Sequence, residues 1–194
     1  MANKIYAFLG SHMSGKSTMV SQLMSMGIHY IPTVTTRVFD DRYAYKRRLY
    51  QTVKGDAYKQ EKFIVNNTYQ AQSYGLRKSE VLDAYQKHKI SIALIHDVAG
   101  IKQLQKFINQ DLVSIFLMIN DEVFVDRMLR AGCSNDEIRY YVETADETGE
   151  FEHWRDVDFV VKNTSTARVA LEQILAIMGL VTLVPQTDFD LLVK

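Results

Sequence analysis

Apolar runs and amphipathic segments alternate along most of this chain. Four apolar runs are short and rich in Ile, Val, Leu and Phe, which is typical of strands buried on both faces. The segment after each run spaces its apolar residues by three or four, as an amphipathic helix does. This alternation predicts an α/β fold in which a parallel sheet lies between layers of helices. The predicted strands cover residues 4–9, 90–97, 112–119 and 158–163, and the predicted helices cover residues 16–26, 100–109, 121–130 and 165–179.

Capping residues mark several of the predicted helix ends. Asn120 or Asp121 caps the helix over 121–130, and Gly179 is placed to end the last helix. Ser134 and Glu137 have the S-x-x-E spacing of a capping box, which predicts a further, charged helix after residue 134.

Two stretches break the alternation. Residues 33–78 are rich in tyrosine and basic residues without a clean period, and residues 131–152 hold the charged helix. Segments inserted between the core strands of an α/β sheet often face the substrate. We therefore expect one domain over residues 1–194, with core segments 1–32, 79–130 and 153–180, inserted segments 33–78 and 131–152, and a tail 181–194 that is either an edge strand or a mobile end.

The composition is that of a soluble globular protein. Of the 194 residues, 47% are hydrophobic and 24% are charged, which is enough for a sizeable core. Lys plus Arg and Asp plus Glu number 23 each, so no overall charge favours nucleic acid or a membrane surface. Cys133 is the single cysteine, which excludes an internal disulfide. The start is too weakly apolar for a signal peptide and no run is long enough to span a membrane, so we expect a cytoplasmic protein.

The stretch after the first predicted strand fits the motif G-x-x-x-x-G-K-[ST]. Its glycines allow a tight loop whose backbone N–H groups surround phosphate oxygens, and the helix that follows adds its positive end. Lys16 brings a cation to the outer phosphates, and the Ser17 hydroxyl is placed to ligate Mg²⁺. Strand, loop and helix stand in the required order. The sequence therefore predicts a P-loop that binds ATP through Gly10, Ser11, His12, Met13, Ser14, Gly15, Lys16, Ser17 and Thr18.

A second short motif follows the strand predicted over 90–97. Asp97 and Gly100 match the D-x-x-G of GTPase switches, but no N-K-x-D guanine motif follows, which argues against a signalling GTPase. Asp97 either faces a ligand at the carboxyl edge of the sheet or caps the next helix.

The stretch "TVTTR" at 33–37 resembles the GMP-binding signature of the guanylate kinase family. Further segments at 63–75, 95–104, 126–132 and 157–163 are similar to family segments and occur in the same order. The resemblance implies a P-loop NTPase fold, with 33–78 as the NMP-binding region and 131–152 as the lid.

The resemblance also implies an activity, the transfer of the γ-phosphoryl group of ATP to GMP or dGMP with Mg²⁺. Lys16 and the lid-side arginines would stabilise the transferring group, and Asn163 would lie near the adenine. Each arginine has the alternative of a solvated charge on a helix face. The implied catalytic arginines are Arg127, Arg130 and Arg139, and the implied acceptor-binding residues are Thr33, Arg37, Arg42, Tyr74, Gly75 and Asp97.

The acceptor side departs from the family pattern. Asp40 stands where the family has its second phosphate-binding arginine, and Arg42 comes two positions late. Val65 and Leu76 replace a glutamate and a hydroxyl residue that read guanine in the family. A site that selects guanine needs buried polar groups, so these changes put GMP specificity in doubt.

The same region leaves two assignments open. The family's other phosphate-binding tyrosine corresponds to one of Tyr43, Tyr45 and Tyr50. The basic run 46–48 forms either a solvated face or an additional phosphate clamp. Two alternative functions remain: transfer to another nucleotide or a ribose phosphate, and a non-catalytic guanylate kinase-like binding module.

Overall fold

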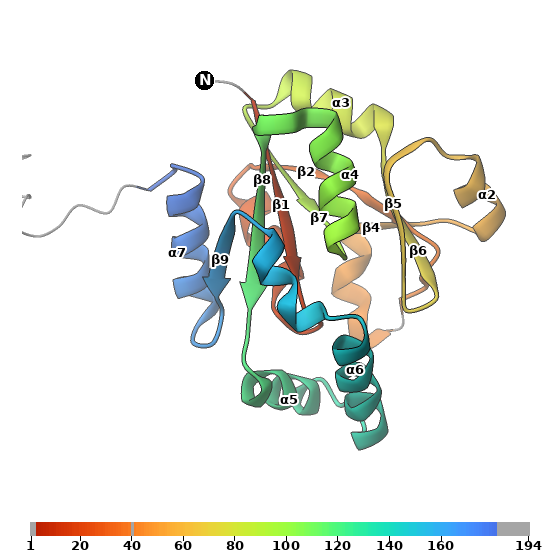
Figure 1. Ribbon diagram of the computed structural model, residues 1–194, viewed down its shortest axis with the longest axis vertical. Helices are drawn as coiled ribbons and strands as arrows, with labels where there is room; N and C mark the ends of the chain where they lie inside the picture. The colour runs from red at the N-terminus through yellow and green to blue at the C-terminus, as the bar shows by residue number, and fades with distance from the viewer. Residues whose placement is uncertain (1–2, 40, 182–194) are drawn as a thin grey trace, which may run out of the picture.

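The computed structural model describes residues 3–39 and 41–181, apart from the side chains of residues 42, 43 and 45. The tail from 182 to 194 lies outside the described residues. The structure is shown in Figure 1. In chain order its elements are β1 (Lys4–Gly10), α1 (Lys16–Ser25), β2 (His29–Ile31), β3 (Thr33–Thr35), the 3₁₀ helix η1 (Asp41–Arg48), β4 (Tyr50–Thr52), α2 (Gly55–Gln60), β5 (Phe63–Tyr69), β6 (Gln72–Arg77), α3 (Lys78–Lys87), β7 (Ile90–Leu94), α4 (Val98–Ile108), η2 (Asn109–Asp111), β8 (Leu112–Met118), α5 (Asp121–Arg130), α6 (Asn135–Glu147), η3 (Glu150–Asp156), β9 (Phe159–Lys162) and α7 (Ala167–Ile177).

The main sheet is parallel and has the strand order β2-β7-β1-β8-β9. Strand β1 is central, with Phe8 opposite Leu94 of β7 and Ile115 of β8. Every residue of β1 after Lys4 is buried, because helices cover both faces of the sheet. The expected α/β fold with a parallel sheet is confirmed.

Two apolar cores lie on opposite faces of this sheet. On one face, α1 and α7 pack on Tyr6 and Phe8 of β1. On the other face, α3 and α4 pack on Ile5, Ala7 and Leu9. Figure 1 shows α7 and α4 on the two sides of the strands. The alternation of side chains along β1 thus supplies both cores.

The stretch from 33 to 77, which has no clean period, forms a second sheet with the order β4-β3-β6-β5. Strands β3 and β4 have three residues each, too short to show a period of two. This sheet meets the main body through α4, because Val65 and Leu76 join the core that contains Ile101.

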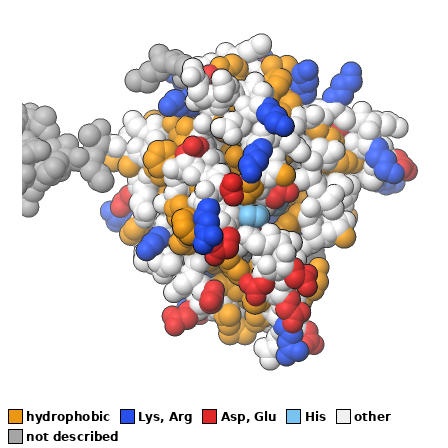
Figure 2. All heavy atoms as spheres, viewed as in Figure 1, with side chains coloured by type: hydrophobic (Ala, Val, Ile, Leu, Met, Phe, Trp, Pro, Cys, Tyr) orange, Lys and Arg blue, Asp and Glu red, His pale blue; other side chains and the backbone are white. Residues whose placement is uncertain are grey.

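Helices α5 and α6 form the lower end of the molecule in Figure 1. Asn120 caps α5, and the predicted capping box of Ser134 and Glu137 is present at α6. Cys133 is buried between these helices. Figure 2 shows that acidic side chains gather over this end.

Several boundaries differ from the sequence expectation. Strand β7 ends at Leu94 rather than at residue 97, because Asp97 already caps α4, which begins at Val98. Helix α3 and strand β2 were not predicted; α3 buries only Val81 and Ala84, which is too few for a clear pattern. Within the described part of the chain, no helix has the length and apolar character needed to cross a bilayer.

Candidate functional site

The P-loop lies between the end of β1 at Gly10 and the start of α1 at Lys16. Met13 and Gly15 have positive φ values of 58° and 95°, so two residues of this short loop adopt the left-handed backbone conformation. A Cβ atom at position 15 would clash with the amide of Asn163, which explains why glycine is required there. Ser11 and Ser14 are buried within the loop.

Side chains from two other elements hold the loop in this shape. The Asn163 amide, just after β9, donates to Ser14 O at 2.8 Å. Arg127 of α5 donates to Met13 O at 2.9 Å and to Asn163 O at 2.8 Å. Arg127 and Asn163 therefore lie beside the P-loop, as the sequence led us to expect, and their visible role is to fix its backbone.

Lys16 folds back over the loop, where its Nζ donates to Gly10 O and to Ser11 O at 2.8 Å. Burial lowers the pKa of Lys16 to about 8, although nearby Glu150 acts in the opposite direction. The amine is therefore held among carbonyl groups of the loop.

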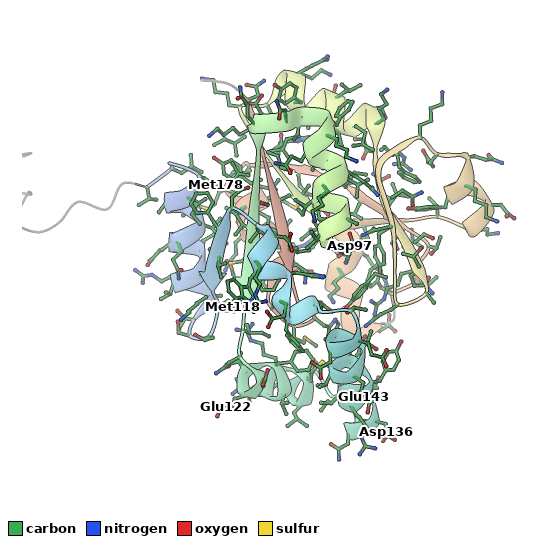
Figure 3. All side chains as sticks on the ribbon, viewed as in Figure 1. Asp97, Met118, Glu122, Asp136, Glu143 and Met178 are labelled. Carbon is green, nitrogen blue, oxygen red and sulfur yellow. The ribbon has the colours of Figure 1, made fainter. Side chains whose placement is uncertain are left out.

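A cavity of about 280 Å³ opens above the P-loop. Its lining, taken over the described residues, includes four cationic side chains and a single carboxylate, that of Glu150. Exposed acidic residues of α5 and α6, by contrast, point away from it, as Glu122, Asp136 and Glu143 do in Figure 3. The cavity thus gathers positive charge inside a chain of zero net charge. The cations are Lys16, Arg37, Lys46 and Arg127.

Five aromatic rings line the cavity together with the P-loop, and we call them the aromatic wall: Phe39, Tyr50, Tyr69, Tyr74 and His96. The rings pack on one another. The centroid of His96 lies 4.0 Å from that of Tyr74 and 5.6 Å from that of Tyr69, and Phe39 lies 5.0 Å from Tyr50. Tyr50 is therefore the tyrosine of the three candidates whose side chain is seen at the cavity; those of Tyr43 and Tyr45 lie outside the described part.

Arg37 stands at the edge of this wall. The "TVTTR" spacing positions it, because the Thr35 hydroxyl accepts from Arg37 N–H at 3.1 Å and donates to Ser73 O at 2.8 Å. The guanidinium contacts the hydroxyls of Tyr74 and Tyr141 by hydrogen bonds. Tyr141 belongs to α6 and also stacks on His12, with ring centroids 4.1 Å apart. One tyrosine thereby joins Arg37 to the P-loop.

The basic run 46–48 divides in two. Lys46 lines the cavity, whereas Arg47 bonds Asp41 and Phe39 O and, like Arg48, is exposed. Arg47 and Arg48 therefore form a solvated face, and Lys46 is the residue of this run that could still contact a phosphate at the cavity.

Both cavity histidines are kept neutral. Burial and three nearby cations lower the pKa of His96 to about 3, and the same causes lower the pKa of His12 well below its usual value. Nε2 of His96 is shielded from solvent, and the described residues offer it no hydrogen-bond partner. The histidines therefore add no charge to the cavity near pH 7.

Behind the aromatic wall the protein interior is tightly packed. Val65 and Leu76 are 2% and 1% exposed, and the space that they share with His96 is too small for a water molecule. Thr33 also faces this interior, where its hydroxyl donates to Leu94 O at 3.4 Å. Gly75 lies against the ring of Phe63. Thr33 and Gly75, which the sequence analysis placed at the acceptor, do not line the cavity: Thr33 bonds to β7, and Gly75 packs within the second sheet.

Asp97 is the N-cap of α4, labelled in Figure 3, and accepts from Gly100 N–H at 2.7 Å. It does not appear among the residues that line the cavity. Of the two alternatives for the D-x-x-G motif, the structure shows the helix cap, and the expectation that Asp97 faces an acceptor is corrected.

The structure also leaves two predicted arginines outside the cavity. Arg130 is 79% exposed and pairs with Asp126 one turn away on α5, and Arg139 is exposed on α6. Both lie on outer helix faces, so the expectation that they reach the transferring group is not met in this arrangement. The side chain of Arg42 lies outside the described residues.

Among the cavity residues, Phe39, Tyr69, His96 and Glu150 were not assigned a ligand contact from the sequence, whereas Lys46 belonged to the basic run that was left open. Glu150 follows α6 and carries no motif. His96 is adjacent to Asp97 and follows the end of β7, at the carboxyl edge of the main sheet. Ligands bind at this edge, so its position after a predicted strand could have identified it.

No protein-family model and no curated protein matches the sequence. Solved structures do match. A guanylate kinase from Anaplasma phagocytophilum superposes with a TM-score of 0.66 at 18% identity, over 92% of this chain and 85% of that one. The chain has a P-loop kinase-like fold. The protein TT1252 from Thermus thermophilus gives a TM-score of 0.53 at 14% identity, over 94% of this chain and all of that one. At these identities the similarity shows the fold alone.

Proposed function

We propose that this protein transfers the γ-phosphoryl group of MgATP to the phosphate of a phosphomonoester. The observation that carries the proposal is the meeting of a P-loop and several cations at one cavity, with Lys16 on the donor side and Arg37 and Lys46 on the other. Phosphoryl transfer needs this combination, because charge accumulates on the transferring group and on both oxygens in line with it.

The donor phosphates would lie in the P-loop, at the positive end of α1. Lys16 would leave the carbonyls of Gly10 and Ser11 and contact the outer phosphates. Ser17 lines the cavity at the start of α1, where its hydroxyl fits a magnesium ion that takes its other ligands from phosphates and water. That ion would neutralise charge on the β- and γ-phosphates.

The acceptor phosphate would lie between Arg37, Lys46 and the hydroxyls of Tyr50 and Tyr74. Arginine presents a planar fork that matches phosphate oxygens, and lysine adds a point charge. Lys46 would take the part of the family's second phosphate-binding arginine, at whose position Asp40 stands. Because an ionised phosphate is already a nucleophile, the transfer requires alignment of the two substrates and no general base.

The resemblance to the guanylate kinase family makes GMP or dGMP the first acceptor to test. One observation favours a second candidate, a different nucleotide or a ribose phosphate. Val65 and Leu76 are sealed in the apolar core, and Asp97 is engaged as a helix cap. A guanine base would find no polar side chain at positions 65 and 76, and one oxygen of the Asp97 carboxylate is already held by Gly100 N–H, so we infer that the acceptor is recognised through its phosphate.

The test is ADP formation from MgATP with a panel of acceptors: GMP, dGMP, AMP, CMP, UMP and ribose 5-phosphate. The Lys16→Ala protein serves as the control for contaminating kinases. Turnover with at least one phosphomonoester, lost in the control, is the expected result. No turnover with any acceptor, together with retained ATP binding, would contradict the proposal and favour a binding module that keeps its P-loop.

A further inference from the structure

Glu150 is a buried acid that the proposed transfer does not use. It is the first residue of η3, directly after Gly149, and only 4% of it is exposed. Its carboxylate lies in the cavity among the cationic side chains. A buried carboxylate requires partners, and those of Glu150 define what it does.

The partners of Glu150 are groups of the phosphate site. The backbone N–H of His12, inside the P-loop, donates to the carboxylate, and Lys16 interacts with it electrostatically. The Tyr69 hydroxyl of the aromatic wall donates to Oε2 at 3.0 Å. A P-loop amide, a lysine and a hydroxyl are the donors that a phosphate oxygen would use.

We propose that the Glu150 carboxylate occupies the P-loop in place of a phosphate group and is displaced when a nucleotide binds. This inference rests on the proposed function, since it takes the P-loop as a nucleotide site. The His12 N–H and Lys16 cannot serve both anions fully, and a carboxylate that stayed would repel the triphosphate. Glu150 is thus an internal competitor of the donor nucleotide.

Displacement of Glu150 would reach the other side of the cavity. Tyr69 loses its acceptor when the carboxylate leaves, and the Tyr69 ring stacks on His96, which packs on Tyr74. Glu150 also follows α6, whose Tyr141 contacts Arg37. Nucleotide binding would therefore release both the aromatic wall and the segment after α6.

The test is the affinity for MgADP, measured by calorimetry on the full chain. Glu150→Gln keeps the shape and the hydrogen-bonding oxygen but removes the charge, so it competes less well; we expect about tenfold tighter binding. Glu152→Gln is the matched control, because Glu152 lies in the same 3₁₀ helix but is exposed and paired with Arg155. It should leave the affinity unchanged.

Tighter binding distinguishes competition from a structural role, since damage to the fold would weaken binding. Equal or weaker binding by Glu150→Gln would overturn the inference, and weaker binding would mean that Glu150 assists the nucleotide. If that variant did not fold, Glu150→Asp, whose shorter carboxylate cannot reach the same donors, should also bind more tightly, and unchanged or weaker binding would overturn the inference. Failure of the wild type and all variants to bind MgADP would instead overturn the proposed function, and the inference with it.

Discussion

The P-loop and the aromatic wall line the same cavity but are built differently. The P-loop is one contiguous segment, and its shape follows from backbone geometry at Met13 and Gly15. The aromatic wall draws side chains from residues 39 to 96, spread over the second sheet and the end of β7. A site made of backbone leaves a spacing in the sequence, whereas a site made of converging side chains leaves almost none. The P-loop is accordingly the better defined of the two parts.

The largest expected effect is on the donor side. Lys16→Ala removes the cation nearest to the transferring group, so turnover should fall about a thousandfold. The variant should stay folded but melt at a lower temperature, because Gly10 O, Ser11 O and the buried Glu150 carboxylate each lose a partner. Lys102→Ala, at an exposed lysine paired with Asp156, is the control and should retain full activity. Turnover within tenfold of the wild type for Lys16→Ala would contradict the assignment of the P-loop.

The next effect concerns the closed space behind the aromatic wall. Val65→Glu places an unpaired carboxylate in an apolar core and should lower the free energy of unfolding by about 3 kcal/mol. Val38→Glu, at a valine that is 82% exposed, should change it by less than about 0.5 kcal/mol. Urea denaturation measures both. If Val65→Glu were as stable as the wild type, position 65 would be open to a ligand, as in the family pattern.

Substitution of the cations beside the aromatic wall should change the KM for the acceptor and leave the binding of ATP unchanged. Arg37→Ala should raise the acceptor KM about thirtyfold, and Lys46→Ala about fivefold, with the affinity for ATP unchanged. Arg48→Ala is the control, since Arg48 is exposed at the end of the same 3₁₀ helix. Steady-state kinetics with each substrate varied in turn gives these values. A change confined to the KM for ATP would show that Arg37 contacts ATP and not the acceptor.

A pH profile sharpens the description of the donor side. The pKa of Lys16 is lowered to about 8, and phosphate binding requires the protonated amine. Above pH 8 the amine must regain a proton in order to bind, so the affinity for MgADP should fall about tenfold between pH 7 and pH 9. Calorimetry at each pH measures it, and Lys16→Ala should show no such slope. A flat wild-type profile would contradict a role for this amine in binding.

The same contrast explains what the sequence could predict. The four longest strands of the main sheet were predicted from the sequence, with errors only at their ends. Buried apolar runs, and the helical periods between them, are local signals that a sequence shows directly. The P-loop segment was likewise found. Arg127 and Asn163 were placed at the ATP site, but the contacts seen for them are with the P-loop backbone, and their predicted roles at the transferring group and the adenine stay predictions. Glu150 and His96 were not found, because their position at the cavity depends on how α6 and the second sheet pack. Asp97 was assigned to a ligand as one alternative, but the nearest free N–H, that of Gly100, takes its carboxylate.

The central claim is that the donor is bound in detail while the acceptor is recognised through its phosphate. The most direct measurement is the ratio of kcat/KM for GMP to that for ribose 5-phosphate, with MgATP saturating. We predict a ratio within about tenfold of one, because the two acceptors share the phosphate and Val65 and Leu76 offer no polar partner to the base. A preference for GMP above about a hundredfold would contradict the claim and would show that a guanine site opens behind the aromatic wall.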